Sequence, residues 1–364
     1  MTKIKELISI LEKTVPLSYQ ESWDNCGLIV GEKENKITSV LLSLDVTEDV
    51  VDEAIQLQAN IIIAHHPIIF KGLKSLTGKN YVERTVIKAI KNDIAIYAMH
   101  TNLDNYPQGV SYKMAQKLSL KNISNLDIAP NNLKKLVVFV PNAYADKIRT
   151  AIFDAGAGHI GNYDQCSYNV EGKGTFRPLK ESHAFVGQID KLHHEKETRI
   201  ETIFPSHIEN ELIRKIHEVH PYEEVAYDIY HLNQNDKTVG LGKIGELEEA
   251  MNEVDFLQNL KNTFQLQNLR HTPLLGKKIK KVAVCGGSCS FLIQKAKHKA
   301  DIFITADVKY HEFFDAENDL VIADIGHFES EQYSKDIFYD IISKNFSNFA
   351  VHFSEINTNP INYL

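Results

Sequence analysis

Cysteines and long apolar runs are scarce in this 364-residue sequence. The four cysteines, none of them in a CxxC pair, are too few and too scattered for a disulfide framework. No apolar run approaches the roughly 18 residues that a membrane-spanning helix needs. Residues 1–13 have a helical apolar pattern but carry Glu6 and Glu12, unlike a signal peptide, so we expect them to remain on the mature chain. We therefore expect a cytoplasmic protein with no membrane partner.

The sequence also has fewer basic than acidic residues. Lys and Arg number 40 against 48 Asp and Glu, and the formal net charge is -8. Such a surface repels a phosphate backbone, so nucleic acid is not an expected partner. The sequence contains no Walker or Rossmann phosphate-binding loop. The pair Gly286-Gly287 by itself is a weak signal for one. The composition, 43% hydrophobic and 24% charged, is typical of a globular protein, and about 150 residues per domain suggests two or three domains.

Short β-branched runs alternate with helical patterns in the first 125 residues. They predict the order βαβαβ of a parallel sheet covered by helices, with strands at 37–44, 60–64 and 94–99 and helices at 49–57 and 81–91. The C-terminal part repeats this order: "KKVAVCGGS" resembles "TSVLLSLDV", "ADIFITADVKYH" resembles "ANIIIAHHPIIF", and "DLVIADIGHFESE" resembles "DIAIYAMHTNLD". Any two α/β segments share some likeness, and that alternative stays open. We predict an α/β protein in which two pseudo-repeated halves form one domain.

The middle segment, residues 126–232, has a different pattern. Its strands and helices follow the order βα(ββ)αβ, which predicts an inserted ferredoxin-like α+β domain. The predicted divisions are therefore 1–125 for the N-terminal half, 126–232 for the insertion and 233–364 for the C-terminal half. Within the insertion, "HPYEEVAYDIY" is interpreted as a turn and an interface edge in preference to a small-ligand site.

Histidines and carboxylates follow three of the predicted strands. These polar clusters contain His65 and His66, then His100 and Asp104, and finally His327 and Glu331. The carboxyl ends of parallel strands meet at one edge of a sheet, where open α/β sheets bind ligands. His327 and Glu331 are an i, i+4 pair that shares one face of a helix, as a chelating pair requires. The pattern favours a metal site over a set of hydrogen-bonded structural histidines.

Several nearby residues are further candidates for the site. His100 is a candidate for a residue that orients a ligand or acts as an acid, with a hydrogen-bonded structural histidine as the equal alternative. Asp45 is interpreted as a helix cap in preference to a partner of a metal-bound histidine. Asp307 and His311 occupy the repeat position of the histidine pair, so they are candidates for substrate binding or proton transfer. Cys289 is interpreted as a small buried apolar residue in preference to a thiolate ligand or nucleophile.

At this point the motifs resemble a known family. The segments "ESWDNCGLIVG", "AHHPIIF", "HTNLD", "GG", "ADVKYHE" and "DIGHFESE" occur in the order typical of the GTP cyclohydrolase 1 type 2 homologue family, the Nif-three-like dinuclear metal proteins. The resemblance implies a two-metal centre with the ligands His65, His66, Asp104, His327 and Glu331. It also implies a PII/CutA-like inserted domain and a homohexamer. Where the family shows GGSG and TGD, this chain has "GGSCS" and "TAD", which change two glycine turns and leave the ligands intact.

The predicted function follows from the ligand types. Imidazole and carboxylate without thiolate suit two divalent ions per subunit, with zinc preferred and manganese, iron, cobalt or nickel admissible. Two adjacent ions activate water, so the leading hypothesis is a metal-dependent hydrolase acting on a small nucleotide-like substrate. The GTP cyclohydrolase label comes with the family and not from any guanine-reading motif. The alternative is a non-catalytic, metal-handling or regulatory assembly, which needs no open coordination position.

Overall fold

The computed structural model describes residues 2–364. The chain divides into two compact units, one made of the residues up to Ile128 together with Lys237–Leu364, and a second made of Ala129–Asp236. They are called unit 1 and unit 2 below. The sequence analysis placed the insertion at 126–232, whereas unit 2 spans 129–236. No helix within residues 2–364 is long and apolar enough to cross a membrane.

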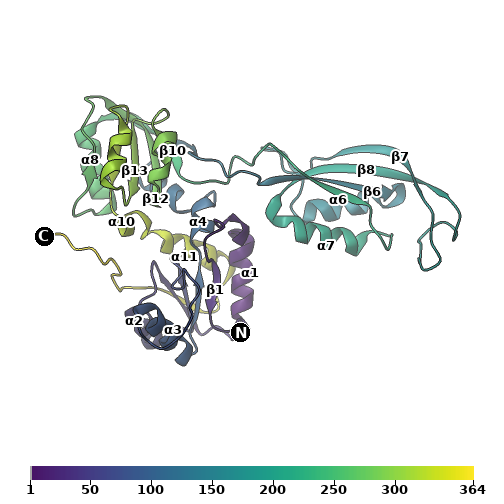
Figure 1. The fold of residues 1–364 in the computed structure, drawn as a ribbon, viewed down its shortest axis with the longest axis horizontal. Coiled ribbons are helices and arrows are strands. Elements are labelled where there is room, and N and C mark those ends of the chain that lie inside the picture. Colours follow the sequence, from purple (N-terminus) through teal and green to yellow (C-terminus); the bar gives the residue numbers. More distant parts are fainter. Residues whose placement is uncertain (1) are drawn as a thin grey trace. The chain divides into compact units, whose positions relative to one another are not determined.

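Unit 1 contains two sheets, and the first holds the N-terminal strands (Figure 1). Its order is β1-β4-β3-β2-β15, with β1 (Gly27–Val30), β2 (Ser39–Ser43), β3 (Ile61–Ala64), β4 (Ala95–Ala98) and β15 (Ala350–Phe353). The strands β2, β3 and β4 are parallel neighbours, whereas β1 is antiparallel to β4. All residues of β2, β3 and β4 are buried, as expected of strands covered on both faces.

Helices cover both faces of this first sheet. Alternate residues of a strand point to opposite faces, so Val40 and Leu42 share a core with one pair of helices, while Leu41 packs against another pair. The first pair is α1 (Ile4–Thr14) and α11 (Ser334–Asn345), and the second is α2 (Glu48–Gln56) and α3 (Tyr81–Lys91). The sheet is therefore buried between two helical layers.

The second sheet of unit 1 repeats this plan. Its order is β11-β14-β13-β12-β10-β5, with β5 (Lys121–Asn125), β10 (Lys243–Asn252), β11 (Arg270–His271), β12 (Lys278–Ser288), β13 (Ile302–Ala306) and β14 (Val321–Asp324). The strands β12, β13 and β14 are parallel, and β11 is antiparallel to β14 as β1 is to β4. Its helices include α5 (Val110–Lys117), α8 (Glu253–Phe264), α9 (Ile293–Ala296) and α10 (His327–Glu331). The structure is thus mixed α/β, as predicted.

The two halves of unit 1 exchange edge strands, which departs from the predicted division. The C-terminal strand β15 pairs with β2 in the first sheet, and the N-terminal strand β5 pairs with β10 in the second. An edge strand pairs with whichever free backbone edge lies beside it in the folded protein, not with its neighbour in sequence. The exchange and the packing of α11 against α1 interlock the halves.

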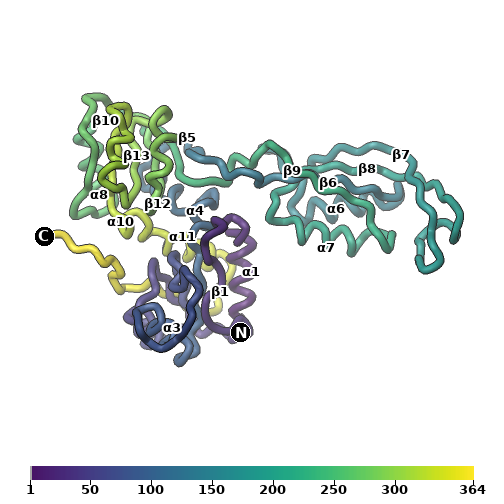
Figure 2. The backbone as a smooth tube through the Cα atoms, viewed as in Figure 1, coloured from purple at the N-terminus to yellow at the C-terminus, as the bar shows by residue number. Residues whose placement is uncertain are grey.

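Unit 2 contains one antiparallel sheet with the order β7-β8-β6-β9. Along the chain the elements are β6 (Leu133–Pro141), α6 (Ala145–Asp154), β7 (Tyr168–Phe176), β8 (His193–Pro205), α7 (Glu209–Val219) and β9 (Tyr227–His231). Figure 2 shows the strands side by side with both helices on one face, where Leu136, Ile148 and Leu212 belong to a common core. This element order is the one that the sequence predicted; the likeness to PII and CutA proteins stays a prediction.

Candidate metal centre

The N-terminal half contributes polar residues from the ends of two neighbouring strands. His65 and His66 follow β3, and the backbone N–H groups of both donate to the Leu44 carbonyl. His100 follows β4 and is the N-cap residue of α4 (Thr101–Asn105), on which Asp104 lies. Because β3 and β4 are parallel neighbours, their carboxyl ends meet at one edge of the sheet.

The C-terminal half contributes α10, which begins just after β14. Gly326 precedes it with a φ of 91°, a left-handed conformation that favours glycine. His327 and Glu331 then project from one face of this short helix. The structure brings them to the residues of the other half, forming three groups whose ligand atoms lie within 4.8 Å of one another: His65, His66 and His100; His66, His327 and Glu331; and His65, Asp104 and Glu331. All five residues proposed as ligands are therefore neighbours.

Glu331 lies at the middle of this cluster. Its Oε2 is 3.0 Å from Nε2 of His66 and 3.0 Å from Nε2 of His327. Its Oε1 is 3.7 Å from Nε2 of His65. The Nε2 of His65 is in turn 3.8 Å from Asp104 Oδ1. The two carboxylate oxygens of Glu331 thus face two different sets of ligand atoms.

Two polar atoms in this cluster are buried without a hydrogen bond to any group within residues 2–364: His65 Nε2 and Asp104 Oδ1. An unsatisfied buried polar atom is costly, and each case in a folded protein calls for an explanation, of which a bound ion is one. Imidazole nitrogens and carboxylate oxygens are the donors that divalent transition metals accept. The residues present therefore fit a metal centre. The side chains of His66 and His327 are 23% and 34% exposed, so the cluster is reachable from solvent.

Each of the four histidines of the cluster forms a hydrogen bond through its Nδ1. The partners are Met99 O for His65 at 2.8 Å, Asp45 Oδ1 for His66 at 2.7 Å, Asp24 Oδ1 for His100 at 2.8 Å and Asp307 Oδ2 for His327 at 2.7 Å. A proton held on Nδ1 leaves Nε2 as the ligand atom, and such outer partners orient metal-binding imidazoles. The four rings are therefore oriented with Nε2 available at the cluster.

The interpretation of Asp45 as a helix cap is wrong. Thr47 caps α2 by accepting a hydrogen bond from the Val50 N–H, while Asp45 binds His66. The sequence could not decide between these roles, because both residues follow β2 and either side chain is a good cap.

Asp24 is a site residue that the sequence analysis missed. Its Oδ1 holds His100, and its Oδ2 accepts hydrogen bonds from the N–H and the hydroxyl of Thr101. Burial raises the pKa of Asp24, but the hydrogen bonds from His100 and Thr101 outweigh it and lower the pKa well below its usual value. The only signal in the sequence was its place in "ESWDNCGLIVG", one of the segments that carry the family resemblance.

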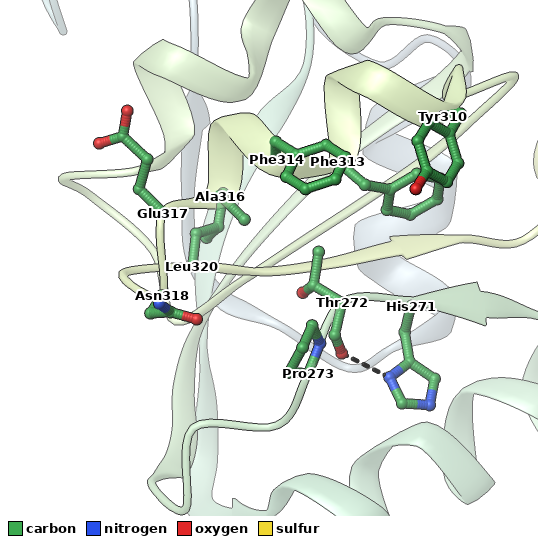
Figure 3. A pocket seen from close by; sticks show the side chains of 10 residues that line it. All are labelled: His271, Thr272, Pro273, Tyr310, Phe313, Phe314, Ala316, Glu317, Asn318 and Leu320. Atoms are coloured by element: carbon green, nitrogen blue, oxygen red, sulfur yellow. Dashed lines mark hydrogen bonds between the residues drawn. The ribbon is translucent and has the colours of Figure 1, made fainter.

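The structure separates the two candidates of the C-terminal repeat. Asp307, with a φ of 54°, contacts His327 at the cluster. His311 is exposed and its ring contacts those of Tyr310 and Phe314. Tyr310 and Phe314 line a separate cavity of about 570 Å³, shown in Figure 3. Only Asp307 of this pair therefore touches a ligand residue in the described chain.

The carboxylates and imidazoles of the cluster shift the pKa values of one another. Burial works against the charged form of Glu331, but the neighbouring imidazoles of His65, His327 and His66 outweigh it and lower the Glu331 pKa. Burial also opposes protonation of His66 and His327, yet their carboxylate partners raise the pKa of His66 to about 10 and that of His327 to about 11. Burial and the charge of Glu331 raise the pKa of Asp104 to about 7. Without metal, the carboxylates thus favour the positively charged form of both imidazoles.

A glycine loop packs against Glu331. Gly287 has a φ of 68°, its N–H donates to Ser330 Oγ at 2.9 Å, and a Cβ at this position would lie 2.2 Å from Glu331 Oε1. The same loop contains a disulfide between Cys285 and Cys289, whereas Cys26 and Cys166 are free. The sequence predicted no disulfide framework and gave no sign of this local pair. Cys289, paired and 7% exposed among apolar residues, is not a free thiolate in this structure.

Replacing Gly287 with alanine is expected to displace Glu331 and reduce bound metal by at least about tenfold, because the new methyl group overlaps a ligand oxygen. The control is Gly276→Ala: Gly276 also has a left-handed φ of +71°, but the described chain places no atom within 4 Å of its Cβ position. Both changes cost about 1 kcal/mol of backbone strain. Metal content measured by mass spectrometry should fall only in the first variant; equal metal in both would contradict the packing argument.

The chain is similar to known proteins over nearly its whole length. The sequence model of the Duf34/NIF3 (NGG1p interacting factor 3) family matches residues 2–360. A GTP cyclohydrolase 1 type 2 homolog from Bacillus subtilis is 38% identical over 368 residues, covering 99% of this chain and 98% of the relative. Another with the same name, from Halalkalibacterium halodurans, is 43% identical over 324 residues, covering 88% and 87%. The crystal structure of a Bacillus cereus protein related to NIF3 superposes with a TM-score of 0.87 at 40% identity, covering 100% of this chain and 99% of that one.

Proposed function

Because the chain belongs to the Duf34/NIF3 family, we propose that it is a dinuclear metal-dependent hydrolase that acts on a small, nucleotide-like substrate. Membership confirms the family resemblance found in the motifs. The observation that carries the proposal is the position of Glu331, whose two oxygens face two groups of ligand atoms from both halves of unit 1.

The two groups would supply ligands to two ions. His66 and His327 with Glu331 Oε2 would hold one ion, and His65 and Asp104 with Glu331 Oε1 would hold the other. When bound, two divalent ions supply an activated water nucleophile and stabilise negative charge that develops on the substrate. Zinc is the preferred metal, and manganese, iron, cobalt and nickel suit the same donors.

His100 is the proposed proton-transfer residue. Asp24 holds its Nδ1, which leaves the other ring nitrogen for a proton of the substrate or leaving group. Its ring lies 5.3 Å from the ring of His65 and 5.4 Å from that of His66, so it borders the ligands. His100 also belongs, with His65 and His66, to one of the groups that could hold a metal ion. The alternative to proton transfer is therefore that His100 is a metal ligand.

Two exposed aromatic residues support a planar substrate. Trp23 and Phe70 are 58% and 44% exposed, and their ring centroids are 5.7 Å apart. Both rings also contact His100, at 6.2 and 6.3 Å. Exposed rings beside a polar centre are suited to stacking a flat heterocycle. The relatives named GTP cyclohydrolase 1 type 2 homolog make a purine nucleotide the first substrate to assay.

The test is metal content by mass spectrometry on protein purified without an affinity tag, together with hydrolysis assays on GTP and on generic phosphoesters. We expect about two ions per chain and a turnover, and we expect both to be lost in His66→Ala. The control His194→Ala changes a histidine of unit 2 outside the metal-binding groups and should alter neither. Metal without turnover would favour the metal-handling alternative, and no bound metal after reconstitution with each candidate ion would overturn both.

We also propose that the chain assembles as a homohexamer, which rests on the resemblance alone. Light scattering coupled to size-exclusion chromatography should then give six times the chain mass. A single-chain mass would contradict it.

A further inference from the structure

The C-terminal segment Ser354–Leu364 contains no helix or strand, yet its start is tied to the first sheet of unit 1 (yellow in Figure 1). The Ser354 N–H donates to the Leu42 carbonyl at 2.8 Å, and the Glu355 N–H donates to Glu53 Oε1 at 2.8 Å. Chain ends are usually mobile unless such bonds hold them. The segment therefore leaves β15 from a defined place and in a defined direction.

Thr358 of this segment contacts the partner of a ligand residue. Its hydroxyl donates a hydrogen bond of 2.6 Å to Asp45 Oδ2. The other oxygen of Asp45 holds His66 Nδ1 at 2.7 Å. The Asp45 carboxylate is 34% exposed, so without Thr358 its Oδ2 would face water and only the bond to His66 would orient the carboxylate. Thr358 thus sets the orientation of the carboxylate that sets the orientation of His66.

Asn359, the next residue, contacts the other half of the centre. Its side-chain N–H donates to Glu329 Oε1 at 3.0 Å. Glu329 lies on α10 between the ligand residues His327 and Glu331. Two adjacent side chains of the C-terminal segment therefore contact both parts of the chain that carry ligand residues. Thr358 reaches His66, in the loop after β3, through Asp45, and Asn359 binds α10 through Glu329.

We propose that Thr358 and Asn359 are positioning residues of the metal centre, which clasp the ligand residue His66 and the ligand-bearing helix α10 at their observed separation. The inference rests on the metal binding proposed above but concerns residues outside the ligand set. Groups that orient a ligand residue typically contribute 10- to 100-fold to metal affinity. An ordered C-terminal segment is therefore part of the site although it holds no metal ligand.

The first experiment measures Zn²⁺ affinity by competition with a chelating dye. Thr358→Val removes the hydroxyl at nearly constant volume and should weaken binding by about tenfold. Thr358→Ser keeps the hydroxyl and should restore the affinity to within about twofold of wild type. The control Thr38→Val removes a hydroxyl that donates to the Gln58 carbonyl in the same half and should leave the affinity unchanged. Asn359→Ala should also weaken binding, since α10 loses its tie.

A double-mutant cycle separates positioning from a general loss of stability. If Thr358 acts through Asp45, Thr358→Val should cause little further loss of Zn²⁺ affinity in an Asp45→Asn background. A full tenfold loss in that background would overturn the inference. The visible absorption spectrum of the Co²⁺-loaded protein gives a second readout, because it reports ligand geometry: it should change in Thr358→Val and not in Thr38→Val.

The outcomes distinguish this inference from the proposed function. Tight Zn²⁺ binding by wild type with unchanged affinity in Thr358→Val and Asn359→Ala overturns only the positioning role. Zn²⁺ binding that depends on Thr358, without hydrolysis of any substrate, supports the positioning role and counts against the hydrolase. Wild-type protein that binds no metal overturns both.

Discussion

Replacing Glu331 with glutamine is expected to remove both metal ions from the protein and to abolish any hydrolysis. One side chain serves two groups of ligands, and its oxygens lie 3.0 Å from two imidazoles and 3.7 Å from a third. An amide has one oxygen and no negative charge, so it cannot bridge two cations. We expect the affinity for each ion to fall by at least about 100-fold, more than for a change in any single outer partner.

The measurement is metal stoichiometry by mass spectrometry, with Zn²⁺ titration for the affinity. The control is Asp336→Asn, which neutralises a carboxylate on α11 that is 42% exposed and 3.6 Å from Lys113. It should keep both ions. Retention of one ion in Glu331→Gln would show that the two groups bind independently and would contradict a shared carboxylate.

Metal binding is expected to strengthen steeply as the pH rises. In the metal-free protein the pKa of His66 is raised to about 10 and that of His327 to about 11, while that of Asp104 is raised to about 7. A protonated imidazole cannot bind a cation, so a proton must leave each ligand on binding. Between pH 6 and 9 the apparent Zn²⁺ affinity should therefore rise about tenfold per pH unit for each proton released.

The stability of the metal-free protein should change in the opposite direction. A histidine whose pKa is raised on folding stabilises the folded state most below its unfolded pKa of about 6.5. That contribution is lost as the pH rises through the folded values of about 10 and 11. The melting temperature of metal-free protein should fall with rising pH over this range, while the increase on adding Zn²⁺ should grow.

Calorimetric titration in buffers of different ionisation enthalpy counts the protons released at each pH. The variant Asp45→Asn removes a carboxylate that raises the pKa of His66, so its affinity should depend less steeply on pH. An affinity independent of pH between 6 and 9 would contradict the protonated, metal-free cluster.

Local sequence patterns predicted most of the elements that carry the site. The apolar runs at 60–64 and 94–99 correspond to β3 and β4, because a strand buried on both faces must be apolar throughout. The helix predicted at 81–91 has the same limits as α3, which begins after an Asn80 side chain that caps the Glu83 N–H. The polar residues after such strands nominated a metal site with six candidates, His100 among them, and the choice of five ligands came from the family resemblance.

The sequence by itself determined the α/β elements, the repeat and the ligand types, because these depend on residues close together in the chain. Only the tertiary structure decided the exchange of β5 and β15, the Asp24–His100 pair across 76 positions and the Thr358–Asp45 bond across 313 positions. Such contacts arise when the two sheets pack and leave particular polar groups facing one another. No local pattern encodes which distant partner will satisfy a buried carboxylate or a free strand edge, since many polar side chains and strand edges in the chain would serve equally well.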